Sequence, residues 1–174
     1  MSEETVTLRP VREDDLPLLD PFLTDPEAAG TFQWQGWSDP TRWRRQWHEN
    51  GMLTEDGGTL MVLAAGEPAG FVSWRKVMCW RGSFCWNTGI SLLPSVRGRG
   101  LGASAMRELV RYLFAHTQLV RVEAATEVEN IAAQRVLERA GFSREGVLRS
   151  IAYRDGGWHD GVGYSVLRSD STWQ

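Results

Sequence analysis

Apolar and polar residues follow two different periods along the chain. Alternation with a period of two, bounded by turn residues, predicts strands over residues 5–11, 59–65, 69–78, 83–93, 119–125, 147–153 and 158–167. Apolar residues three or four positions apart predict helices over 13–23, from 38 to 47, 100–116 and 130–140. We therefore expect one α/β (α+β) domain over residues 1–174.

Turns and connections indicate the direction of neighbouring strands. Gly66-Glu67-Pro68 and Asp155-Gly156-Gly157 each separate two predicted strands, which favours antiparallel hairpins. The predicted helix 100–116 connects two strands, and a strand-helix-strand unit makes its two strands parallel. The pattern predicts a mixed, mostly antiparallel sheet with one central parallel step and helices on both faces.

A loop that alternates arginine with glycine follows the strand that ends near Leu93. Its residues run Arg97-Gly98-Arg99-Gly100-Leu101-Gly102-Ala103. Glycines leave the backbone N–H groups uncovered, and the first N–H groups of a helix favour an anion. Two arginines add positive charge there. The segment predicts a binding loop for a phosphorylated ligand, and a plain glycine-rich connection is the alternative.

Two other kinds of phosphate-binding loop are alternatives for this segment. Gly98-x-Gly100-x-x-Ala103 fits the dinucleotide fingerprint, and Glu123 follows at the distance of a ribose-binding acid. However, residues 94–97 separate the strand from the first glycine, and little chain remains to build a dinucleotide fold. Since no Gly-Lys-Ser/Thr occurs, a Walker-type loop is excluded. The dinucleotide interpretation is the weaker alternative.

A second motif lies about thirty residues downstream, where Asn130-x-x-Ala133 precedes Ala140-Gly141-Phe142. Together with Arg97-x-x-Gly100-x-Gly102, it resembles the acetyl-coenzyme A binding core of the GNAT N-acetyltransferase superfamily over residues 84–145. The pattern is closest to the Rim-type ribosomal-protein alanine N-acetyltransferases. The resemblance implies a GNAT-like sheet, acetyl-coenzyme A as cosubstrate, and a small-molecule amine or protein N-terminus as acceptor.

The resemblance also assigns residues to the coenzyme. Backbone N–H groups of the glycine loop would hold the pyrophosphate, the end of the preceding strand would pair with the pantetheine arm, and Asn130 would bind that arm near the thiol. A plain helix N-cap is the alternative for Asn130. The residues expected to bind the coenzyme are Leu92, Leu93, Arg97, Gly98, Arg99, Gly100, Leu101, Gly102, Ala103, Asn130 and Arg135.

The usual acid and base of the family are missing from this chain. Asn87 stands where many members have a glutamate, Leu137 where they have a tyrosine, and Ala133 where Rim-type members often have a serine. The remaining candidates for catalysis are Asn87, Glu127 and Tyr164. We therefore expect direct attack of the amine in a ternary complex, with a coenzyme-binding protein that does not catalyse transfer as the alternative.

Tryptophan is unusually frequent, with nine in 174 residues. Trp43 and Trp47 are one helical turn apart and are explained by core packing. Aromatic residues in a loop are harder to explain without a ligand. The resemblance to the GNAT family implies that the segment between the first two helices lies over the acyl end of the coenzyme. The aromatic residues expected to contact the acceptor are Phe32, Trp34, Trp37 and Trp86.

Composition limits the partners of the chain. A formal net charge of −3 without a basic tail argues against nucleic acid, and no apolar run is long enough to span a membrane. We expect a cytoplasmic location and reduced thiols at Cys79 and Cys85. The three histidines are isolated, so no metal site is expected. A homodimer is one possible assembly of the chain.

Overall fold

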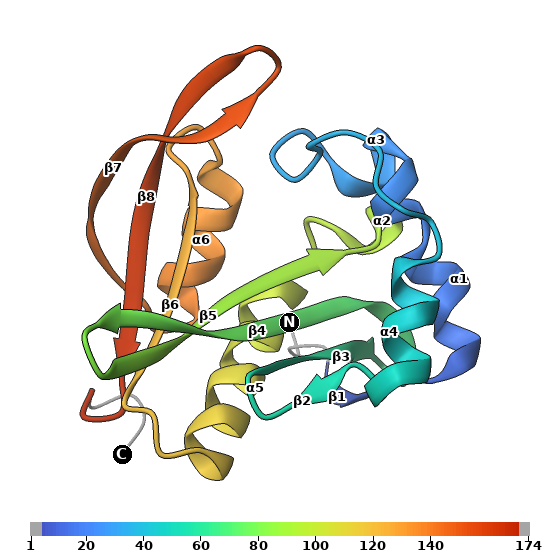
Figure 1. Cartoon of the computed structure of the whole chain (residues 1–174), viewed down its shortest axis with the longest axis horizontal. Coiled ribbons are helices and arrows are strands. Elements are labelled where there is room, and N and C mark those ends of the chain that lie inside the picture. Colours follow the sequence, from blue (N-terminus) through green and yellow to red (C-terminus); the bar gives the residue numbers. More distant parts are fainter. Residues whose placement is uncertain (1–4, 171–174) are drawn as a thin grey trace.

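The computed structural model of the protein describes residues 5–170. Its strands are β1 (Val6–Pro10), β2 (Leu53–Thr54), β3 (Gly57–Ala64), β4 (Glu67–Trp80), β5 (Ser83–Leu92), β6 (Arg121–Glu127), β7 (Ser143–Arg154) and β8 (Gly157–Leu167) (Figure 1). Its α-helices are α1 (Leu16–Leu19), α2 (Pro21–Thr24), α3 (Pro26–Ala29), α4 (Arg42–Asn50), α5 (Leu101–His116) and α6 (Ile131–Arg139). Two 3₁₀ turns, η1 (Glu13–Asp15) and η2 (Pro94–Val96), complete the elements.

The strands form one mixed sheet in the order β1-β3-β4-β5-β6-β8-β7, with β2 paired to β3. Every neighbouring pair is antiparallel except β5 and β6, which are parallel. The predicted sheet with one central parallel step is confirmed. A dinucleotide-binding fold needs a mostly parallel sheet, so that alternative is excluded.

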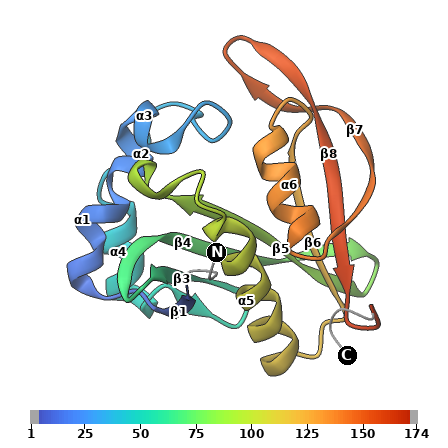
Figure 2. The same cartoon turned by 180° about the vertical axis from the view of Figure 1, so that it is seen from behind.

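Helices cover both faces of the sheet, as predicted (Figures 1 and 2). On one face, buried Val72 and Val122 pack with Leu109 of α5 and with α6. On the other face, Met61 and Phe71 pack with α1 and α4. Phe71 and Val72 are adjacent on β4, and neighbouring residues of a strand point to opposite faces of the sheet. The same strand therefore contributes side chains to the cores on both faces. None of the helices in residues 5–170 has both the length and the apolar character needed to cross a membrane.

The prediction of a single helix over residues 13–23 is wrong, because the chain forms η1 and short helices instead. Pro17, Pro21 and Pro26 lie in the first turns of α1, α2 and α3. Proline has no N–H to donate to the preceding turn, so it begins a helix readily and interrupts one already formed. The resulting bends bring the segment after α3 over the end of β5 (Figure 1).

Helix α4 is held in place by its tryptophans. Trp43 is buried and its indole N–H donates to the carbonyl of Leu19 at 3.1 Å. Trp47 donates likewise to the carbonyl of Val11 at 3.1 Å. The predicted core role of this pair is confirmed, and the two bonds satisfy indole groups that burial would otherwise leave unpaired.

The expectation of free thiols is wrong for this structure. A disulfide joins Cys79 on β4 to Cys85 on β5. Val77 is the register partner of Cys85, so Cys79 lies diagonally across from Cys85, beside a register shift between Met78 and Trp80, with 6.3 Å between the two Cα atoms. Sequence spacing alone did not reveal that shift.

We predict that Trp43→Ala lowers the free energy of unfolding by about 3–5 kcal/mol, because it removes a large buried side chain. Trp37→Ala is the matched control. Its side chain is 82% exposed, so its loss changes the same quantity by no more than about 0.5 kcal/mol. Urea titration followed by circular dichroism measures both. Equal destabilisation by the two variants would contradict the assignment of Trp43 to the core.

Candidate active site

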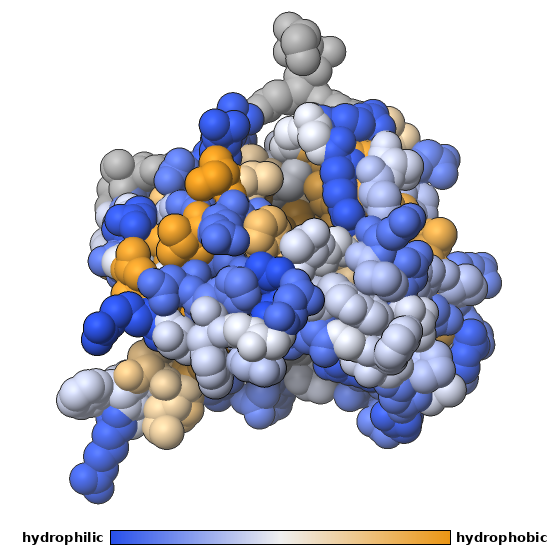
Figure 3. Space-filling model, turned by 90° about the horizontal axis from the view of Figure 1, so that it is seen from above, coloured by the Kyte–Doolittle hydropathy of each residue, from blue (hydrophilic) through white to orange (hydrophobic). Residues whose placement is uncertain are grey.

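A cleft of about 1070 Å³ opens where the two parallel strands separate. β5 and β6 pair at Trp86 with Val122 and at Asn87 with Glu123, and no further parallel pair follows. The cleft is lined by the open ends of both strands, the N-terminus of α5, one side of α6, the loop after α3 and the tip of the β7–β8 hairpin. Seen from above, the surface is hollowed toward the middle, and hydrophobic surface gathers on the side of β7 and β8 (Figure 3).

The glycine loop forms one end of this cleft. Gly98 and Gly100 have φ values of +77° and +82°, in the left-handed region that favours glycine. No side chain caps the N-terminus of α5, which begins at Leu101. Gly98 and residues 100–103 line the cleft. The first turn of α5 therefore presents uncovered N–H groups and the positive end of the helix dipole to the cleft.

Gly102 has a different role from the other loop glycines. A Cβ atom built there would lie 3.0 Å from Cγ2 of Val136, whereas at Gly98 and Gly100 it would meet nothing within 4 Å. Gly102 thus lets α5 and α6 pack closely beside the cleft. Substitutions at Gly102 would disturb this packing, so Gly100 is the cleaner position for testing ligand binding.

Arg97 lines the cleft but is also bonded within the protein. Its Nε donates to the carbonyl of Leu92 at 2.9 Å, and its terminal nitrogens donate to the carbonyls of Ala28 and Glu27. These bonds fasten α3 to the end of β5, which is a structural role the sequence did not indicate. Binding of the coenzyme by Arg97 stays a prediction.

The other predicted coenzyme residues differ in their access to the cleft. Leu92 and Arg135 line it, whereas Leu93 and Arg99 are not among its lining residues. The N–H of Leu93 donates to the carbonyl of Ala69 at 2.9 Å, so this group is already paired within the fold. The structure thus brings most, but not all, of the predicted set together.

Asn130 lines the cleft and is also the N-cap of α6. Its side-chain oxygen accepts a hydrogen bond from the N–H of Ala133 at 3.1 Å, which confirms the capping alternative. The bond uses the oxygen and leaves both N–H donors of the amide for other partners. A second role toward the pantetheine arm stays a prediction.

Glu127 lines the cleft as a partner of Arg154. Its two carboxylate oxygens accept bonds of 3.0 and 2.9 Å from the guanidinium, and both side chains are less than 10% exposed. Hydrogen bonding to Arg154 lowers the pKa of Glu127. A carboxylate with a lowered pKa is a weak base near neutral pH, so the predicted catalytic role of Glu127 is not supported.

The predictions for two site residues are wrong, because these residues lie in the core under helices. Tyr164 is 1% exposed, and its hydroxyl donates to Glu138 at 3.0 Å and lies 3.3 Å from Gln134, both on α6. Burial raises the pKa of this hydroxyl. Trp86 is 4% exposed, and its indole N–H donates to the hydroxyl of Thr117 at 3.0 Å. Strand alternation turns Trp86 to the face opposite Asn87, and α6 covers Tyr164.

The aromatic loop after α3 contributes one of its three predicted residues. Phe32 lines the cleft, and the guanidinium of Arg154 lies 5.4 Å from its ring centre. Trp34 and Trp37 contact each other edge to face at 6.0 Å and are not among the lining residues. Asn87 lines the cleft and is half-buried. Phe32 and Asn87 therefore lie in the cleft, where the sequence analysis expected them.

Sequence reasoning missed Gln33, Arg75, Arg139 and Arg154, which all line the cleft. Gln33 illustrates why: its side-chain nitrogen donates to the carbonyl of Ile90 at 2.8 Å, and its oxygen accepts from the hydroxyl of Ser91. This anchors the loop after α3 to β5 across a long sequence separation. No local pattern indicates such a contact.

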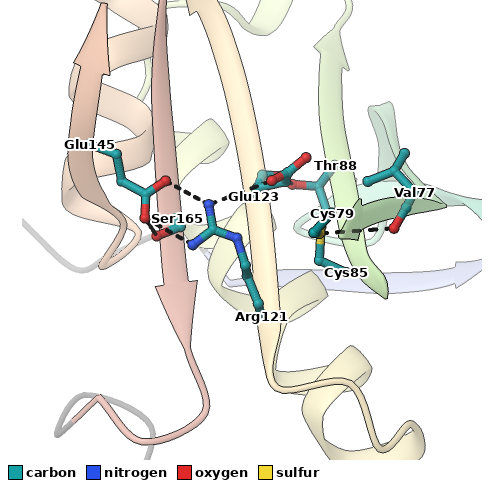
Figure 4. Close-up of polar contacts among 8 residues, drawn as sticks. All are labelled: Val77, Cys79, Cys85, Thr88, Arg121, Glu123, Glu145 and Ser165. Atoms are coloured by element: carbon teal, nitrogen blue, oxygen red, sulfur yellow. Dashed lines mark hydrogen bonds and ion pairs between the residues drawn. A yellow bond between two sulfur atoms is a disulfide. The ribbon is translucent and has the colours of Figure 1, made fainter. Parts of the chain in front are cut away.

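A polar network holds the closed end of the divided sheet (Figure 4). Arg121 forms two bonds with Glu145, of 2.8 and 2.6 Å, and lies 3.5 Å from Glu123. Together with a bond from the Ser165 hydroxyl, Arg121 lowers the pKa of Glu145 to about 2. The hydroxyl of Thr88 donates to the carbonyl of Glu123 at 3.0 Å. These contacts join β5 through β8 just beside the point where the cleft opens.

A divided sheet with an uncapped helix N-terminus at its mouth suits an anionic ligand that can also hydrogen-bond along a strand edge. The family model described as "Acetyltransferase (GNAT) domain" matches residues 5–143. The chain therefore belongs to the GNAT acetyltransferase family. The prediction of an N-acetyltransferase that depends on acetyl-coenzyme A is confirmed at this level.

Curated relatives and solved structures agree with this assignment. The putative ribosomal N-acetyltransferase YdaF of Bacillus subtilis is 31% identical over 86% of this chain and 76% of that protein. The aminoglycoside N(6')-acetyltransferase type 1 of Klebsiella pneumoniae is 28% identical over 84% and 78%. A match to the probable N-acetyltransferase YjcK of Bacillus subtilis, 37% identical, spans only 42% of this chain and 40% of that protein. The spermidine N-acetyltransferase of Vibrio cholerae, solved with CoA and spermine, shares the fold, with a TM-score of 0.81, 18% identity and coverage of 94% and 96%.

We predict that Gly100→Glu weakens coenzyme A binding at least about tenfold, because it places a negative charge at the mouth of an anion site. Gly66→Glu is the matched control. Gly66 has a φ of +89° and equally open space, but it lies in the turn between β3 and β4. Both variants carry the same backbone strain of about 1 kcal/mol. Calorimetric titration that found unchanged affinity for Gly100→Glu would overturn the loop assignment.

The Glu127–Arg154 pair also predicts a dependence of stability on pH. The pKa of Glu127 is lowered from its ordinary 4.5, so the pair stabilises the fold above that pH and is lost as pH falls through the lowered pKa. Glu127→Gln should therefore unfold at lower urea than the parent at pH 7, and the difference should shrink below about pH 4.5. Exposed Glu67→Gln serves as control. A difference that grew on acidification would contradict the pair.

Proposed function

We propose that this protein transfers the acetyl group of acetyl-coenzyme A to a primary amine by direct attack in a ternary complex. The observation that carries the proposal is the separation of β5 from β6 directly after the Asn87–Glu123 pair, beside the uncapped start of α5. An acyl thioester that entered between the strands would meet an amine approaching along the same cleft.

The proposed coenzyme position follows from the chemistry of the cleft walls. The pyrophosphate suits the N–H groups of residues 98–103, and Arg135 and Arg139 on α6 add positive charge to the lining. The pantetheine arm suits the N–H groups on the edge of β5 between Thr88 and Leu92, because that edge has lost its parallel neighbour. The carbonyls of Ile90 and Leu92 already accept from the side chains of Gln33 and Arg97. This places the thioester near the point where the strands separate.

The proposed transfer relies on proximity rather than on a strong side-chain base. The amine nitrogen forms a bond to the thioester carbon, the C–S bond breaks, the amine proton passes to water, and the thiolate takes a proton from water. Glu127 is held by Arg154 and Tyr164 is covered by α6, so neither serves as the base. Asn87 is positioned to hydrogen-bond the amine or that water. Because the thiolate leaves readily, positioning supplies most of the acceleration.

The proposed acceptor is a small-molecule amine or a protein N-terminus. The relatives include a putative ribosomal N-acetyltransferase and an aminoglycoside N-acetyltransferase, and the structures that share the fold include a spermidine N-acetyltransferase and an acetyltransferase of the ribosomal protein L7/L12. These acceptors share a primary amine and differ in the rest of the molecule. The residues around the acceptor end of this cleft must therefore select among them.

Release of coenzyme A thiol over a panel of primary amines tests the proposal. We expect turnover with at least one class of amine, and kcat/KM that rises with pH from 6 to 9 in step with loss of the amine proton. Tight binding of acetyl-coenzyme A without turnover of any amine would contradict the proposal and favour a binding protein. If kcat/KM already reached its plateau near pH 6, only the statement that no side chain acts as the base would be contradicted, and acetyl transfer itself would stand.

We predict that Phe32→Ala raises the KM for the acceptor at least about threefold while leaving the KM for acetyl-coenzyme A unchanged. The reason is that Phe32 lines the acceptor end of the cleft and packs on Arg154. Trp37→Ala is the control, since this exposed indole is not among the lining residues. Steady-state kinetics with each substrate varied in turn distinguishes the two. Equal changes in both KM values would remove Phe32 from the acceptor site.

A further inference from the structure

The acceptor end of the cleft contains an arginine without an ion-pair partner. Arg75 lies on β4 directly opposite Asn87 of β5 and lines the cleft. It is exposed, and within residues 5–170 no carboxylate pairs with it. A positive charge at this position is therefore available to a ligand.

The position of Arg75 places it beside the reacting groups. Residues directly opposite each other in an antiparallel pair point to the same face, and neighbouring strands are about 4.8 Å apart. Asn87 belongs to the last parallel pair before the cleft opens. Arg75 consequently projects to the face from which an amine would approach Asn87, close enough to contact a substituent of that amine.

No free acid balances Arg75 within the cleft. Among the described lining residues, Glu127 is the one carboxylate, and both of its oxygens are bonded to Arg154. A second ammonium group on the acceptor would lose water on entering the cleft without gaining an unpaired carboxylate. It would also meet repulsion from Arg75.

Acids just outside the lining do not change this balance. At the tip of the β7–β8 hairpin, Asp155 is bonded to Arg154 at 2.5 Å and Asp160 accepts from the N–H of Ser150 at 2.8 Å. Glu129, just before α6, is exposed and does not line the cleft, although its carboxylate lies within 4.8 Å of that of Glu127. Glu123, the register partner of Asn87, lies 3.5 Å from Arg121 and does not line the cleft either. Among the described residues, no unpaired carboxylate therefore lines the cleft.

We infer that the acceptor of this protein is a primary amine that carries a carboxylate close to the amine and no second positive charge, and that Arg75 binds this carboxylate. The inference rests on the proposed function and deepens it. Polyamines and aminoglycosides, which carry several cations, are poor acceptors for this cleft. Arg75 is a specificity-determining residue and takes no part in bond making.

Matched acceptors test the inference. The peptides Ser-Asp-Ala-Ala, Ser-Asn-Ala-Ala and Ser-Lys-Ala-Ala, all amidated at the C-terminus, differ only in the charge beside the terminal amine. Alanine and alaninamide, which differ only in the carboxylate beside the amine, form a second arm that distinguishes an amino acid from a peptide, and spermidine and kanamycin represent polycations. The enzymes are the unaltered chain, Arg75→Ala, Arg75→Glu, and Arg81→Ala as a control on the exposed turn between β4 and β5.

For the unaltered chain we expect kcat/KM for an acidic acceptor to exceed that for its amide counterpart by about tenfold or more. This is the effect expected when one hydrogen bond between charged groups is lost. Arg75→Ala should bring this ratio close to one through the acceptor KM, with the affinity for coenzyme A unchanged. Arg75→Glu should favour the lysine peptide, and Arg81→Ala should behave as the parent.

Two results would overturn the inference while leaving acetyl transfer in place. One is a higher kcat/KM for spermidine or kanamycin than for any acidic acceptor. The other is an acidic preference that survives in Arg75→Ala. If no amine were turned over although acetyl-coenzyme A bound, the proposed function would fail, and the inference would fail with it.

Discussion

The separation of two parallel strands is the constraint on which the rest of the site depends. Once β5 and β6 have paired at two positions, they diverge, and the edge of β5 loses its neighbouring strand. The side chains of Gln33 and Arg97 donate to the carbonyls of Ile90 and Leu92, which leaves the N–H groups of this edge without a strand partner. Unpaired backbone groups favour any ligand that can hydrogen-bond as a strand would. The glycine loop and α5 follow directly from the end of β5, so the anion site and the open edge belong to one continuous cleft.

The divergence is maintained from both ends. At the closed end, Arg121, Glu145 and Ser165 join β6 to β7 and β8 (Figure 4). At the open end, Arg154 connects the hairpin to β6 through Glu127 and packs on Phe32 of the opposite wall. Removal of one member of a buried ion pair would leave the other charge unpaired, so each pair holds its two elements together. The cleft is thus an ordered part of the fold and not a gap left by poor packing.

The parts of the fold that local physics determines were predicted from the sequence. Glycines with positive φ at 98 and 100, the apolar stripe of α5 and the Asn130 cap all leave short-range signals. Trp86 and Tyr164 were misplaced because the face on which a strand residue lies depends on which face the helices cover. Gln33 and Arg154 were missed because their partners are distant in sequence and no periodicity relates them.

The central claim is that the N–H groups at the start of α5 hold the coenzyme, so that its thioester lies between the diverging strands. A crystal structure of the complex with acetyl-coenzyme A tests it most directly. We expect pyrophosphate oxygens about 3 Å from backbone nitrogens of residues 98–103 and the acetyl group beside Asn87. A coenzyme bound elsewhere, or with its thioester outside the space between β5 and β6, would contradict it.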